Sequence, residues 1–173
     1  NDFTNTGYAM RKRMDTSTDF FAGVYSWPDS YFFRYADVLL MHAEAENEAV
    51  GPDATVYGAL DQIRTRAGVP TVSSVYPNVS QAEMREIIRR ERRVELAFEG
   101  KRYWDLIRWK TAEVNINRSL KAMHITASGS TLTYDVIDAA RGNRKFDASK
   151  NYVLPIPQSA ISRNTNLTQN PNY

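Results

Sequence analysis

Residues 91–109, with the sequence ERRVELAFEGKRYWDLIRW, are the most informative part of this chain. They predict the end of one helix, a hinge at Gly100, and the start of a second helix. At 100° per residue, the carboxylates of Glu91 and Glu95 fall near the middle of the apolar face of the first helix. That face is formed by Met84, Ile87, Ile88 and Phe98.

A carboxylate on a buried helix face is tolerated only when cations or hydrogen-bond donors satisfy it. Arginines close in sequence can provide them. We therefore expect a structural ion network that fixes the angle between the two helices at Gly100. Its predicted members are Glu91, Arg92, Glu95, Arg102 and Asp105.

The alternative is that the two glutamates are catalytic. Glu91 and Glu95 are one helical turn apart, which could match the ~5–5.5 Å between the carboxyl groups of a retaining glycosidase. However, neighbouring arginines lower the pKa of a carboxyl group and so remove its capacity as a general acid. The sequence also has no Gly-x-Ser-x-Gly motif and no glycine-rich phosphate loop. We therefore expect no enzymatic activity.

Composition excludes several other classes of function. The 173 residues are 42% hydrophobic and 24% charged, which is typical of one globular domain. The net charge of +2 is too small to create a strong electrostatic field around the protein. There is no cysteine, and His42 and His124 lack metal-ligand spacing, so we expect neither metal nor cofactor. Glutamates interleave with the arginines between Arg85 and Arg93, which argues against nucleic acid. No apolar run approaches the ~20 residues of a membrane span.

Four helices are predicted within residues 30–114, after a loop-rich segment at 1–29. The first, at about 30–50, has two apolar faces with Asp37 on the polar stripe between them, so it should pack between neighbours. Asp53 caps a second helix that runs to Arg66, and residues 71–79 form a loop. A capping box at Ser80 and Glu83 starts the third helix, which ends near Gly100. The fourth runs from about Arg102 to Val114.

Residues 115–173 have a more irregular pattern. Met123–Ala127 and Thr131–Tyr134 flank a Ser-Gly-Ser turn and predict a short β-hairpin. The prolines at 155 and 157 favour an extended segment, followed by a short turn at 158–161. The predicted fold is mainly α, because residues 30–68 match a tetratricopeptide-like helical hairpin in size. Irregular loops and the short β-hairpin complete it.

Short blocks in a fixed order give the chain a family resemblance. They are RYADVLLM with AEA at 34–45, IR with RAG at 63–68, ER and ELAFEG at 91–100, DL with RW at 105–109, LPIPQ at 154–158 and QNPNY at 169–173. Together with Thr6-Gly7-Tyr8, these blocks resemble the C-terminal region of the SusD/RagB family. His42 and Glu46 depart mildly from the family pattern.

The resemblance implies a non-catalytic protein that binds oligosaccharide at the outer cell surface and delivers it to a SusC-like TonB-dependent transporter. The alternatives are a peptide-binding nutrient uptake protein and a purely structural partner of the transporter. Family members are Bacteroidota outer-membrane lipoprotein components of polysaccharide utilization. They are about three times longer, so we expect the N-terminal half and its lipid anchor to lie outside residues 1–173.

Aromatic side chains are the expected ligand contacts, because the C–H faces of sugar rings pack on tryptophan and tyrosine. One candidate group lies in a polar loop segment and the other in the hinge motif. The predicted ligand-binding residues are Tyr25, Trp27, Asp29, Tyr31, Tyr103 and Trp104.

Overall fold

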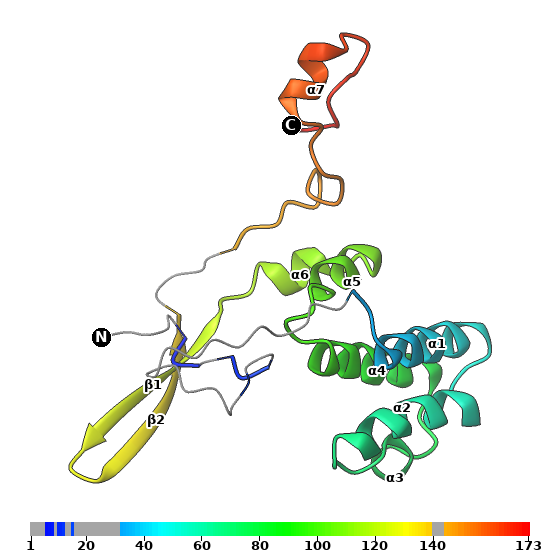
Figure 1. Ribbon diagram of the computed structural model, residues 1–173, viewed down its shortest axis with the longest axis vertical. Helices are drawn as coiled ribbons and strands as arrows, with labels where there is room; N and C mark the ends of the chain where they lie inside the picture. The colour runs from blue at the N-terminus through cyan, green and yellow to red at the C-terminus, as the bar shows by residue number, and fades with distance from the viewer. Residues whose placement is uncertain (1–5, 9, 13–14, 16–31, 140–143) are drawn as a thin grey trace. The chain divides into compact units, whose positions relative to one another are not determined.

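The computed structural model describes residues 6–8, 10–12, 15, 32–139 and 144–173 (Figure 1). The chain divides into two compact units, of which one is Ser17–Arg102 and the other joins Asn1–Thr16 to Tyr103–Tyr173. Helices dominate, and a two-stranded antiparallel sheet is present. The predicted fold class, mainly α with a short β-hairpin, is confirmed.

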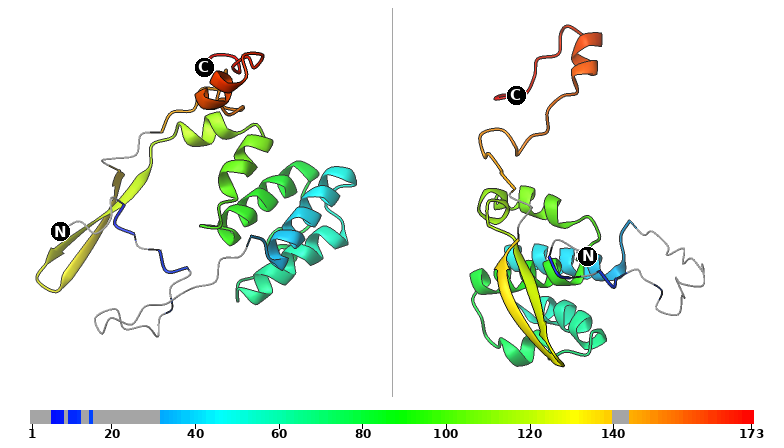
Figure 2. Two further views of the ribbon diagram at one scale, coloured as in Figure 1. Left: turned by 45° about the horizontal axis from the view of Figure 1, so that its top comes forward. Right: turned by 90° about the vertical axis from the view of Figure 1, so that its left-hand side faces the viewer.

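Three helices build the core of the first unit. Helix α1 (Tyr35–Ala49) contacts both α2 (Ala54–Arg66) and α4 (Gln81–Glu95), and it lies between them in Figures 1 and 2. Apolar side chains from all three helices are removed from water there, which is the main source of their stability. The buried core consists of Ala36, Leu40, Ala43, Val56, Ala59, Leu60, Ile63, Val72, Met84, Ile88 and Leu96.

The predicted helix caps are confirmed. The Oδ1 of Asp53 accepts hydrogen bonds from the backbone N–H groups of Thr55 and Val56, both at 3.0 Å. At the start of α4, the Glu83 N–H donates to Ser80 Oγ at 3.3 Å while the Ser80 N–H donates to the Glu83 carboxylate at 2.8 Å. Each cap satisfies amide groups that the first helical turn leaves without a partner.

Helix α1 packs between two neighbours, as predicted, but not through both of its apolar faces. Ala36, Leu40 and Ala43 are buried. Tyr35 and Val38, on the other predicted face, are 68% and 43% exposed to solvent. Within the described residues, α2 and α4 therefore cover one apolar face only.

The segment at 71–79 is not the simple loop that the sequence predicts, because it contains the one-turn helix α3 (Val72–Val75). Asp61 of α2 organises this turn. Its carboxylate accepts from the N–H of Val72 at 2.6 Å and from the hydroxyl of Ser73 at 2.5 Å. Thr71 is the N-cap of α3, and Asp61 adds contacts from 11 and 12 positions away, which a local pattern could not reveal.

Helix α4 ends at Glu95, earlier than the predicted end near Gly100. Phe98 and Gly100 both have positive φ angles, 63° and 74°, so the chain turns sharply there. The placement of Phe98 on the apolar face of the third helix is therefore wrong, since its side chain is 67% exposed and lies outside α4.

The predicted fourth helix is divided into α5 (Arg102–Arg108) and α6 (Ala112–Ile116). Lys110 adopts a left-handed conformation with φ of 55°. The Thr111 N–H bonds to the Leu106 carbonyl and the Lys110 N–H to the Ile107 carbonyl, which is the Schellman pattern that terminates a helix. Lysine is an uncommon residue at this position, so the break has no clear sequence signal.

The hairpin is confirmed and is longer than predicted. Strands β1 (Lys121–Ser128) and β2 (Thr131–Asp138) pair antiparallel from Ser128 opposite Thr131 to Lys121 opposite Asp138. Gly129 opens the two-residue loop with φ of 60°, which suits the first central position of a type II′ turn.

Short elements complete the second unit. The turn predicted at 158–161 is a six-residue helix, α7 (Gln158–Arg163). Leu106, Ala112 and Phe146 form a small buried cluster on which Tyr152 packs. The rings of Phe146 and Tyr152 meet edge to face, with centroids 4.8 Å apart.

The cap at Asp53 predicts a pH-dependent contribution to stability. Hydrogen bonds from Thr55 and Val56 lower the pKa of Asp53. A carboxyl group whose pKa is lowered by folding stabilises the protein above its unfolded pKa, about 3.9, and loses that effect as pH falls through the folded value. Asp53→Asn keeps a capping oxygen but cannot titrate.

We expect native protein to exceed Asp53→Asn in melting temperature at pH 7, with the difference shrinking as pH falls from 5 to about 2. Thermal denaturation of both proteins across this range measures it. A difference that stays constant with pH would contradict this role of the charge.

Candidate functional site

The predicted ligand-binding residues fall into two groups. Tyr25, Trp27, Asp29 and Tyr31 lie outside the described residues. Tyr103 and Trp104 lie on α5, where they are 38% and 58% exposed. Their rings meet edge to face, with centroids 5.2 Å apart and planes at 76°.

Helix α5 presents this aromatic pair because its other side is anchored. Leu106 is buried against Phe146 and Ala112, which holds the opposite side of the helix. Two adjacent exposed rings provide apolar surface that a sugar ring can cover, while the ligand hydroxyls remain available to water and polar groups. Of the six predicted ligand-binding residues, Tyr103 and Trp104 are the two that the structure describes.

Two charged residues of α5, Asp105 and Arg108, form an ion pair a few positions after these aromatic residues. Asp105 is buried, and its Oδ1 accepts from Nε and Nη2 of Arg108 at 3.0 and 2.9 Å. The guanidinium of Arg108 also lies 4.8 Å from the ring centroid of Trp109, a cation–π contact. Membership of Arg102 and Asp105 in the network of α4 stays a prediction.

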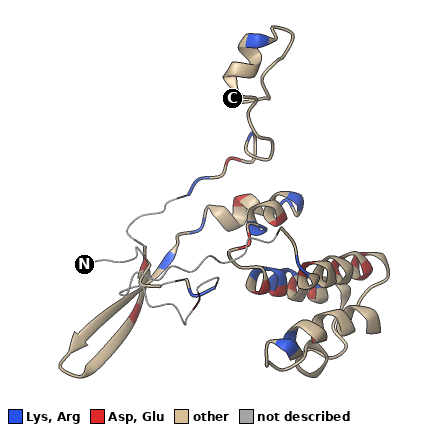
Figure 3. Cartoon of the chain, viewed as in Figure 1, with Lys and Arg blue, Asp and Glu red and all other residues tan. Residues whose placement is uncertain are grey.

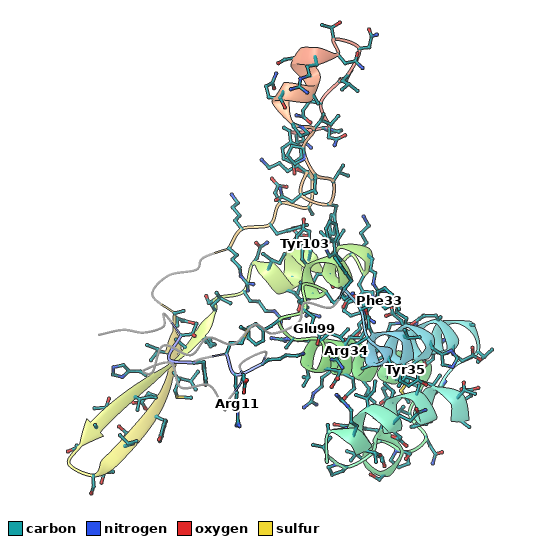
Figure 4. All side chains as sticks on the ribbon, in the orientation of Figure 1. Arg11, Phe33, Arg34, Tyr35, Glu99 and Tyr103 are labelled. Atoms are coloured by element: carbon teal, nitrogen blue, oxygen red, sulfur yellow. The ribbon has the colours of Figure 1, made fainter. Side chains whose placement is uncertain are left out.

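The glutamates of α4 pair with arginines from other helices. Glu95 accepts from Arg34 Nη1 at 2.5 Å and also from Arg66 of α2. Arg34 additionally donates Nε and Nη2 to Glu99, at 3.1 and 2.8 Å. Glu91 lies 4.0 Å from Arg64. In Figure 4, Arg34 and Glu99 lie together where the start of α1 meets the end of α4.

Arg34 is thereby held as a cation. Burial lowers its pKa, but hydrogen bonds and charge attraction from Glu99 and Glu95 outweigh burial and raise the pKa above its usual value. The Glu99 side chain is only 1% exposed, so this pairing is shielded from solvent. Arg34 and Glu99 were not among the predicted members of the ion network at the end of α4.

A second ion cluster corrects the sequence analysis at Asp37. The sequence placed Asp37 on a polar stripe of the first helix, but its side chain is only 4% exposed. Its carboxylate lies 3.1 Å from Arg92 Nη1 and 2.9 Å from Lys101 Nζ. Arg92 is also 4.0 Å from Glu44. A burial of this kind depends on partners 55 and 64 positions away along the chain.

These contacts favour a structural role for the two glutamates of the opening motif. A glycosidase needs two carboxyl groups that flank an open sugar site, whereas these two side chains contact arginines of neighbouring segments. Glu95 bonds two arginines and its side chain is 13% exposed. This ion lock, formed by Arg34, Arg66, Glu95 and Glu99, connects α4 with α2 and with the start of α1.

Two further arginines of α4, Arg85 and Arg89, also pair with glutamates. The Arg85 guanidinium lies 2.6 Å from the Glu48 carboxylate of α1, and its hydrogen bond lowers the pKa of Glu48. Arg89 bonds Glu86 at 2.8 Å one turn away. Figure 3 shows basic and acidic residues mixed along α4. Such pairing weakens the positive field that a nucleic acid phosphate backbone requires.

Within the described ranges, no group of three or more histidine, cysteine, aspartate or glutamate residues could hold a metal ion. In the same ranges, no helix is both long and apolar enough to cross a membrane.

The ion lock predicts that Glu95→Gln lowers the free energy of unfolding by about 2 to 4 kcal/mol, because Arg34 loses an ionic partner in a partly buried setting. Changing Glu91 to Gln as well should lower the melting temperature further. Urea denaturation measures these changes.

Glu86→Gln is the matched control for that experiment. Its side chain is 70% exposed and its bond to Arg89 lies within one helix, so it should cost less than about 0.5 kcal/mol. Equal stability of Glu95→Gln and Glu86→Gln, with ligand binding lost only in the former, would overturn the structural role of Glu95.

Comparison with known proteins gives a consistent result. The SusD family profile matches residues 1–173. SusD-like protein P2 of Formosa agariphila is 35% identical over 146 residues, which cover 81% of this chain and 25% of that protein. SusD-like protein P38 of the same organism is 41% identical over 85 residues, covering 46% of this chain and 17% of that protein.

A solved structure agrees with these relatives. The crystal structure of a SusD-like protein from Bacteroides fragilis matches with a TM-score of 0.70 and 30% identity, over 84% of this chain and 26% of that one. The chain thus spans about a quarter of the length of SusD-like protein P2 and of the Bacteroides fragilis protein. From the family profile along its whole length, the shared sequence and the shared fold, we conclude that the chain belongs to the SusD family.

Proposed function

We propose that the protein binds an oligosaccharide at the outer cell surface, without catalysis, and delivers it to a SusC-like TonB-dependent transporter. SusD-like proteins are associated with nutrient binding at the cell surface and are generally non-catalytic. A lipid anchor in the outer membrane, outside residues 1–173, would hold the protein there. The relatives support this proposal through their family and not through any named ligand.

The exposed pair of Tyr103 and Trp104 is the observation that carries the proposal. Covering a large aromatic side chain is worth about 1.5–3 kcal/mol, so a ligand that packed on these two adjacent rings would gain free energy. Sugar rings offer the matching C–H surface. The contacts of Glu95 support capture without hydrolysis, since Arg34 and Arg66 occupy its carboxylate.

Titration calorimetry of the full chain against a panel of oligosaccharides tests the proposal. Trp104→Ala should weaken binding of the preferred glycan about tenfold, because one stacking contact is lost. Tyr134→Ala is the control, since Tyr134 is 60% exposed on β2 and should leave affinity unchanged.

Other results would favour the alternatives. Tight binding of peptides with no glycan binding would indicate a peptide uptake protein. Capture of the transporter without any soluble ligand would indicate a structural partner. Loss of glycan hydrolysis in a folded Glu95→Gln variant would restore the catalytic interpretation.

A further inference from the structure

A pocket of about 310 Å³ opens between α1 and α2, away from the aromatic pair of α5 in sequence. Its lining is mostly apolar and includes Tyr35, Leu39 and Ile63. Ile63 is buried and Leu39 packs on the helical core, so these walls are held in place. The volume lies at the lower end of the range for small-ligand sites, about 300–1,000 Å³.

Polar side chains also line the pocket, and among them Arg66 and Gln62 have polar atoms that are not hydrogen-bonded within the described residues. Arg66 is 58% exposed and uses Nη2 to bond Glu95, while its Nε and Nη1 have no partner among the described residues. Gln62 donates Nε2 to the Gly58 carbonyl at 3.3 Å, and its Oε1 has no bond within the same part of the chain. The pocket therefore offers a guanidinium with unused donors beside an apolar floor.

The exposed charge at this pocket is positive although the local ion cluster is balanced. Arg34 also lines the pocket, but Glu95 and Glu99 occupy its donors. Both glutamate side chains are largely buried, at 13% and 1% exposure, whereas Arg66 is 58% exposed. A ligand in the pocket would meet Arg66 before it met either carboxylate.

We propose that this pocket binds a carboxylate that carries a branched apolar group of side-chain size. The apolar group fills the space over Leu39 and Ile63, and the carboxylate accepts from the unused donors of Arg66. Guanidinium and carboxylate form short, charge-assisted hydrogen bonds in this geometry. A hydroxyl-rich sugar is a poorer fit, because the apolar floor would leave its hydroxyl groups without partners. The site shares no residue with the oligosaccharide surface proposed for α5.

Two sources supply this chemistry: the C-terminal end of a peptide and a free branched-chain organic acid. N-acetyl-leucine represents the first and 4-methylpentanoate the second. The amide of N-acetyl-leucine keeps the apolar group and removes the negative charge. Glucuronate keeps the charge and replaces the apolar group with a sugar ring. None of these comparisons requires a change to the protein.

Titration of the full chain, followed by the methyl NMR signals of Leu39 and Ile63, measures binding at the pocket itself. We expect both branched carboxylates to shift these signals, and N-acetyl-leucinamide and glucuronate to bind at least about tenfold more weakly. The stronger of the two carboxylates identifies the source. Shifts that are equal for N-acetyl-leucine and its amide, or absent for both carboxylates, would overturn the proposal.

Arg66→Gln tests the residue directly and should weaken binding of N-acetyl-leucine about tenfold. Arg93→Gln is the matched control, because Arg93 is an exposed arginine of α4 outside the pocket lining. A melting curve of each variant checks that the fold persists. Unchanged affinity in folded Arg66→Gln would also refute the proposed site. Neither result bears on oligosaccharide binding at α5.

Discussion

The bonds from Arg34 to Glu95 and Glu99 are the constraint on which the helical unit depends. One guanidinium at the start of α1 contacts two carboxylates and the Glu95 carbonyl at the end of α4, across 61 and 65 positions of sequence. Breaking one partner of such a pair costs more than the intact pair contributes, because the remaining charge stays partly buried. The ion lock therefore joins α1 and α4 at this one point, and its loss would leave a partly buried charge there.

The lock also determines what the chain can do chemically. The carboxylates that would be candidates for acid–base catalysis are engaged by arginines, while Val94 and Phe98 expose apolar surface beside the turn. Phe98 and Gly100, on either side of Glu99, adopt positive φ angles in the turn that follows α4.

Much of the fold could be predicted because its signals are short-range. The caps at Asp53 and Ser80 and the Gly129 turn involve hydrogen bonds between residues at most three positions apart. The break at Lys110 was missed because lysine rarely adopts a left-handed conformation. For the site, sequence indicated that Tyr103 and Trp104 were candidates, but their exposure depends on how Leu106 packs against Phe146.

By itself the sequence determined the family, the helical class, the starts of α2, α4 and α5, and the presence of inward-facing glutamates on α4. The first helix begins at Tyr35, later than the predicted start at about residue 30. Periodicity and capping act within a few residues, so they can be interpreted without coordinates. Only the tertiary structure decided which cations those glutamates meet, that Asp37 is buried with Arg92, and that Arg66 keeps unused donors at a pocket. These outcomes depend on contacts between helices far apart in the chain, where burial and charge pairing are set jointly by all the packed neighbours.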